Sequence, residues 1–159
     1  MSKPKLIPDD VRNACLQYVR GYERLVREYY SKRREILTTK SCRRVEVADP
    51  EQPGQTMWVY PPSGHEASRG TEDVALRLAA IEEQFPTRVM RAVEQARSRI
   101  GADLPDELRN KLADAVWLSC KNGRIYRYEI LDVPGVGRSS FYERRRDFLT
   151  DIARLLDFL

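Results

Sequence analysis

The stretch RIYRYEILDVPGVGRSSFYERRRDFL, residues 124–149, predicts a short helix, a glycine-rich turn and a second helix. We expect the first helix over Ile125–Leu131 and the second from near Arg138. Pro134 removes an amide donor and disfavours helix at the residue before it, and the two glycines that follow permit positive φ angles. A helix pair joined by such a turn is typical of a helix-turn-helix.

Apolar spacing predicts which side of each helix faces inward. From the first helix, we expect Ile125, Tyr128 (or Tyr126) and Leu131 to face the core, and Val136 to plug it from the turn. In the second helix, apolar residues recur at three-, four- or seven-residue spacing. These are Phe141, Phe148, Ile152, Leu155 and Leu159. The outward face is then Arg138, Ser139, Tyr142, Glu143 and Arg146.

Positive charge is concentrated around this predicted helix pair. Residues 121–146 contain seven basic and three acidic side chains, a net of +4, which equals the formal net charge of the whole protein. Concentrated cationic charge around an exposed helix is typical of a surface that binds phosphate. The alternative is an ordinary helical hairpin whose basic face is only solvated.

Length and composition indicate one helical domain of 159 residues, with few glycines and 33% charged residues. Three scattered cysteines form no CxxC pair, and the single His65 lies in a predicted Pro/Gly/Ser loop, so we expect no metal site and no cofactor. We find no apolar run that spans a membrane and no signal-peptide core near the N-terminus, so the expected location is the cytoplasm.

The fold class that we predict is all-α, in three parts. Residues 1–37 form a long amphipathic helix that Asp9 or Asp10 caps. Its apolar stripe, at alternating four- and three-residue steps, either packs on the chain's own core or forms a homodimer. That stripe consists of Val11, Cys15, Tyr18, Tyr22, Leu25, Tyr29 and Ile36.

Residues 38–70 are predicted to be a loop or linker, and residues 71–159 a helical domain that ends in a helix-turn-helix at 124–156. Residues 43–47 and 57–60 are candidate strands of a small hairpin, with Trp58 as a candidate anchor.

The helices expected after the loop have recognisable ends. We expect a helix that Thr71 caps, with an inward stripe from Val74 to Phe85, and a break at Pro86. A stripe from Val89 to Ile100 follows. Pro105 begins the next helix, and Asn122-Gly123 ends it.

The segments 70–82, 117–126 and 136–156 resemble the RinA/ArpU-type phage transcription activators. These are similar in turn to the C-terminal helix-turn-helix of sigma factors. In that family, a turn is followed by small polar residues, an aromatic, a basic run and an apolar tail, an order that residues 137–149 match. The LDVPGVG turn is richer in Pro and Gly than the usual sigma-like turn.

The turn also resembles a helix-hairpin-helix, which grips phosphates through turn amides without reading sequence. That motif usually has a small residue where Phe141 stands, so the helix-turn-helix is favoured. The GVGRSS segment lacks the lysine of a phosphate loop, and His65 alone makes no catalytic triad, so we do not expect an enzyme.

The sequence therefore predicts a sequence-specific DNA-binding regulator of phage type, acting as an activator on double-stranded DNA, with RNA polymerase as a candidate partner. The alternatives are a DNA-packaging component of the small-terminase kind and a helical protein-interaction module. Lys121 is a further candidate for positioning on the DNA backbone. The predicted DNA-binding residues are Arg124, Arg127, Arg138, Ser139, Ser140, Tyr142, Arg144, Arg145 and Arg146.

Overall fold

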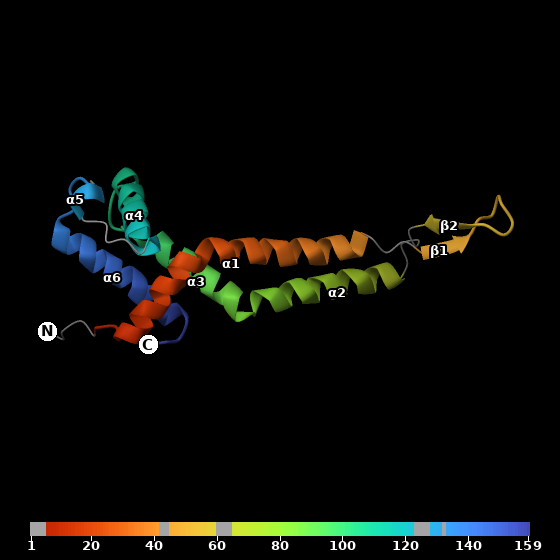
Figure 1. The fold of residues 1–159 in the computed structure, drawn as a ribbon, viewed down its shortest axis with the longest axis horizontal. Helices are drawn as coiled ribbons and strands as arrows, with labels where there is room; N and C mark the ends of the chain where they lie inside the picture. The colour runs from red at the N-terminus through yellow and green to blue at the C-terminus, as the bar shows by residue number, and fades with distance from the viewer. Residues whose placement is uncertain (1–5, 42–44, 60–64, 123–127, 132) are drawn as a thin grey trace. The chain divides into compact units, whose positions relative to one another are not determined.

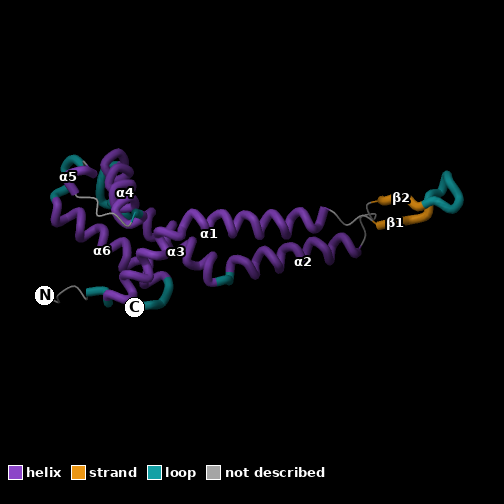
Figure 2. The backbone as a smooth tube through the Cα atoms, in the orientation of Figure 1, coloured by secondary structure: helices purple, strands orange, loops and turns teal. Residues whose placement is uncertain are grey.

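The computed structural model describes residues 6–41, 45–59, 65–122, 128–131 and 133–159 (Figures 1 and 2). Within these ranges the protein is mostly helical with one small antiparallel hairpin, which confirms the all-α prediction. The elements are α1 (Asp9–Ser41), β1 (Val45–Ala48), β2 (Thr56–Val59), α2 (His65–Glu82), α3 (Phe85–Arg99), α4 (Asp106–Lys121), α5 (Tyr128–Leu131) and α6 (Arg138–Leu155).

The chain divides into two compact units. Unit 1 contains residues 1–26 and 85–159, and unit 2 contains residues 27–84, so α1 contributes to both. This division differs from the three consecutive parts that the sequence predicted, because the first helix is shared.

Helix α1 is longer than predicted, since it ends at Ser41 and not near Leu37. Asp9 and Asp10 lie in its first turn, where their charges favour the positive end of the helix dipole. The carbonyl oxygen of Pro8 accepts the first helical hydrogen bond, from the amide of Arg12 at 2.9 Å. The cap position is therefore Pro8, and the acidic residues follow it.

The small hairpin predicted within residues 38–70 is confirmed, but helices α1 and α2 extend into the two ends of this range. The hairpin is present, and Val47 of β1 pairs with Met57 of β2. Trp58 is 62% exposed and does not anchor the hairpin. Helix α2 begins at His65, so Thr71 lies inside the helix and His65 is not in a loop. One glycine inside a helix costs only about 1 kcal/mol, which the surrounding helix formers offset at Gly70.

The core of unit 1 lies between α3, α4, α6 and the first half of α1 (Figure 1). The predicted stripe of α3 is confirmed, because Val89, Val93, Ala96 and Ile100 are all buried. The α1 stripe from Val11 to Leu25 packs on this core, as the own-core alternative predicted. Two predicted inward residues are wrong: Phe85 begins α3 and is 46% exposed, and Leu159 lies beyond the end of α6 and is 56% exposed.

In unit 2 the second half of α1 runs beside α2 in the opposite direction (Figure 2). Tyr29 and Ile81 are buried between the two helices, and the Tyr29 hydroxyl donates a hydrogen bond to the Glu82 carboxylate. No helix within the described ranges is both long and apolar enough to cross a membrane.

Candidate nucleic-acid interface

The turn before α6 is held by its own backbone and by α5. The amide of Val136 donates to the carbonyl oxygen of Val133 at 3.4 Å, and the Tyr128 hydroxyl donates to the carbonyl oxygen of Val136. Gly135 adopts a φ of 78°, a left-handed conformation that favours glycine. Both valines are buried in the core, so the prediction that Val136 plugs the core is confirmed.

Phe141 fixes α6 against the rest of unit 1. Its side chain is fully buried, and its ring centroid lies 5.8 Å from that of Tyr128 in α5. Phe148 and Ile152 continue the same buried face, as predicted. Helix α6 begins at Arg138, also as predicted, and its N-cap residue is Gly137, which has no side chain to accept a hydrogen bond from the first-turn amides.

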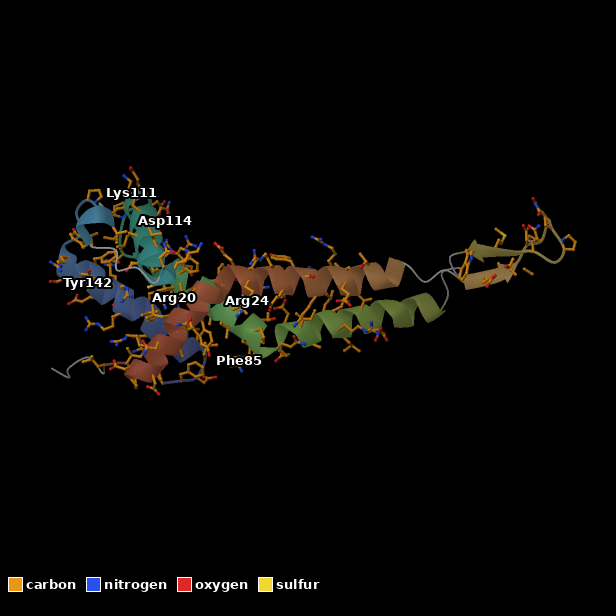
Figure 3. The ribbon with its side chains drawn as sticks, in the orientation of Figure 1. Arg20, Arg24, Phe85, Lys111, Asp114 and Tyr142 are labelled. Carbon is orange, nitrogen blue, oxygen red and sulfur yellow. The ribbon has the colours of Figure 1, made fainter. Side chains whose placement is uncertain are left out.

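One side of α6 presents small polar, aromatic and basic groups to solvent. Ser139, Tyr142 and Arg146 follow one another at three- and four-residue spacing, so they share a side of the helix. Ser139 is exposed, Tyr142 is 36% exposed, and Arg146 is half-buried. Arg138 is exposed at the first position of the helix, and Figure 3 labels Tyr142 on this part of α6.

The other side of α6 is acidic and faces α3. Ser140, Arg144, Asp147 and Asp151 follow at four- and three-residue spacing. A small groove of about 80 Å³ between this side and the end of α3 is lined in part by Arg99, Arg144 and Asp151. Ser140 is therefore turned away from the side that carries Tyr142 and Arg146, although the sequence analysis grouped them.

Arg144 is paired with an acidic side chain at the surface of unit 1. Its guanidinium donates two hydrogen bonds to the Asp103 carboxylate, at 2.7 and 2.8 Å. This hydrogen bonding lowers the pKa of Asp103 to about 2 and raises the pKa of Arg144. The pair ties α6 to the loop between α3 and α4, and the predicted phosphate contact of Arg144 stays a prediction that would have to compete with Asp103.

Arg145 lies on the inward side of α6, four residues after Phe141. It is half-buried, and its Nε atom is buried without a hydrogen-bond partner among the residues described. Burial raises the pKa of the Cys120 thiol, and the nearby positive charges of Arg145 and Arg20 oppose that rise. Arg145 therefore projects towards α4, and its predicted contact with the DNA backbone stays a prediction.

Arg20 belongs to this site although it is distant in the sequence. It is exposed on α1, where Figure 3 labels it. Its charge acts on the Cys120 thiol, as that of Arg145 does. We define the basic side of α6 as Arg138, Ser139, Tyr142, Arg145 and Arg146 of that helix, together with Arg20 of α1. The sequence alone does not indicate Arg20, because only the packing of α1 against the core of unit 1 brings it to this site.

Two further predicted positions lie outside the described residues, namely Arg124 and Arg127. A third predicted backbone contact, Lys121, is engaged in an ion pair with Glu23 of α1.

The basic side of α6 offers guanidinium and hydroxyl groups as hydrogen-bond donors. Phosphate oxygens and base edges can accept these hydrogen bonds.

Comparisons with models of protein families, with curated protein sequences and with solved structures found no match. Within the ranges that the structure covers, no three or more His, Cys, Asp or Glu residues gather as a metal-binding group.

Proposed function

We propose that the protein is a sequence-specific DNA-binding regulator of transcription, of phage or prophage type, with α6 as its recognition helix. The observation that carries this proposal is the two-sided construction of α6. Phe141 holds one face in the core, while Ser139, Tyr142 and Arg146 line an adjacent side that begins directly after an exposed turn. A recognition helix needs this combination, because its N-terminal side chains must reach base edges from a fixed position.

In this proposal the residues of the basic side have different roles. Ser139, Tyr142 and Arg146 reach the base edges in the major groove, where hydrogen-bond donors and acceptors identify each base pair. Arg20 and Arg138 contact phosphates, which positions the helix and adds affinity that does not depend on sequence. Arg145 supports them by adding positive charge behind the contact surface.

The activator part of the proposal has a separate support. It rests on the resemblance of residues 70–82, 117–126 and 136–156 to the RinA/ArpU-type activators. In this proposal the protein acts on double-stranded DNA.

A helix-hairpin-helix that grips phosphates is the second candidate, and the turn favours it. Gly135 and Gly137 are both exposed, and an added Cβ at Gly137 would meet nothing within 4 Å, so a phosphate has room to approach. Phe141 argues against this candidate, because a fully buried aromatic ring occupies the position where that motif has a small residue.

The test starts with selection of bound fragments from a random duplex pool, followed by binding of variants to the selected and a scrambled duplex. Arg146→Ala should weaken binding to the selected site by about 5- to 150-fold, and much less to the scrambled one. Arg154→Ala is the matched control, since this exposed arginine lies in the last turn of α6. Equal losses on both duplexes would favour the phosphate-gripping candidate.

Salt dependence tests the nucleic-acid proposal as a whole. Affinity must fall steeply with salt if several phosphates are neutralised, and Arg20→Ala should reduce the slope by about one. Affinity that does not change across the titration would contradict both DNA-binding candidates.

A further inference from the structure

One side of the helix pair in unit 2 is apolar and uncovered. On α1, Tyr29 and Ile36 are seven residues apart and face α2, since Tyr29 is only 5% exposed and bonds Glu82. The residues that follow them, Tyr30 and Leu37, repeat the seven-residue spacing on an adjacent side. They are 55% and 48% exposed, respectively.

Helix α2 contributes to the same side. Its inward stripe includes Leu78 and Ile81, of which Ile81 is 5% exposed. On each helix, the residue that follows an inward-facing residue is turned by about 100° around the helix axis. Because the two helices are antiparallel, this rotation brings the following residues of both helices to the same side of the pair. Ala75 and Ala79, both small and exposed, therefore lie on the same side of the helix pair as Tyr30 and Leu37.

A groove separates the two helices on this side. It has a volume of about 180 Å³ and is lined by Tyr29, Arg33, Leu78, Ala79, Ile81 and Glu82. Exposed apolar side chains next to a partly apolar groove form a surface that another helix can cover.

We propose that a second copy of this chain covers this side, with α1 of one copy packed on α2 of the other. Charge identifies the partner. Among residues 27–38, four basic and two acidic side chains give a net of +2, and among residues 72–84, one basic and four acidic side chains give −3. Pairing α1 with α1 brings like charges together, whereas pairing α1 with α2 is attractive in both halves of a two-fold dimer.

The size of the surface sets the expected affinity. Helix α2 has 18 residues and so is about 27 Å long, and two adjacent helices are about 20 Å wide. The surface is then on the order of 500 Å² per copy, below the ~800 Å² of a standard interface. We therefore expect monomer and dimer to exchange at micromolar concentrations.

Sedimentation equilibrium of the full chain without DNA tests the surface. The wild type should dimerise between about 1 and 200 μM, and Leu37→Glu should remain monomeric. Ala80→Glu is the control: Ala80 is exposed and is turned by about 100° or more around α2 from Ala75 and Ala79. A monomeric wild type at 200 μM, or equal behaviour of the two variants, would overturn the proposal.

Charge reversal tests whether the partner that binds this side is a second copy of the chain or another molecule. Arg27 and Arg34 lie one heptad apart beside Tyr30, while Glu72 and Glu83 flank the small side of α2. Arg27→Glu/Arg34→Glu gives a chain with two acidic helices, and Glu72→Lys/Glu83→Lys gives one with two basic helices. Each should dimerise at least tenfold more weakly alone, and their equimolar mixture should recover a heterodimer as tight as the wild type.

These four side chains are all exposed, so the double variants should keep the wild-type circular dichroism spectrum and melting temperature. Failure of the folded mixture to associate would overturn the pairing of α1 with α2. The proposal is independent of DNA binding, because none of these residues belongs to the basic side of α6.

Discussion

Removal of the Phe141 ring is the most direct test of how α6 is held. The side chain is fully buried, with ring neighbours in Tyr128 at 5.8 Å and Tyr142 at 5.4 Å. A buried aromatic side chain removes about 150–250 Å² from water, which at about 25 cal/mol per Å² corresponds to ~4–6 kcal/mol. Measured Phe→Ala losses in cores, about 3–5 kcal/mol, lie close to this range.

We therefore expect Phe141→Ala to lower the free energy of unfolding by about 3–5 kcal/mol in urea denaturation. At about 4 °C per kcal/mol, the melting temperature should fall by ~12–20 °C. Tyr142→Ala is the control, because Tyr142 is 36% exposed and should cost only about 1 kcal/mol. If the two variants lose equal stability, Phe141 is not the anchor, and the assignment of the exposed side of α6 fails with it.

Three smaller predictions concern the supports of the site. Hydrogen bonding to Arg144 lowers the pKa of Asp103 from its ordinary value of 3.8 to about 2, so the stability that this pair adds is present above pH 4 and is lost as the pH falls to about 2. Asp103→Asn should flatten this part of an acid-unfolding curve. Gly135→Ala should cost about 1–2 kcal/mol in urea denaturation, because its φ of 78° strains any residue with a Cβ. Burial raises the pKa of the Cys15 thiol to about 11 and also that of Cys120, so alkylation at pH 8 followed by mass spectrometry should modify both far more slowly in native than in unfolded protein.

The apolar patterns of α3 and α6 were predictable because helical period alone decides them. Val89, Val93, Phe141 and Phe148 are buried as their spacing required. The start of α6 at Arg138 was also predictable, because Pro134 and the glycines permit no earlier helix. These predictions depend only on near neighbours in the chain.

The boundaries around the hairpin were less predictable. A Pro/Gly-rich composition suggested a loop from residue 38, yet α1 continues to Ser41 and α2 begins at His65. Each glycine or exposed polar residue costs a helix about 1 kcal/mol or less, and packing between the helices offsets such costs. Local propensity therefore misjudged both ends of the predicted loop.

Which arginines are held in ion pairs could not be predicted from the sequence, because the partners lie far away along the chain. Arg144 resembles its neighbours in the sequence, but Asp103 holds it, and Lys121 is similarly held by Glu23. These ion pairs neutralise two of the cations on which the sequence analysis based its phosphate-binding surface. The packing of α1 adds Arg20 in compensation, so the basic side of α6 is narrower than the sequence implied and lies towards α1. A protein that reads DNA with this helix should therefore place the phosphate backbone along α1, and not along the α3–α4 loop where Asp103 repels it.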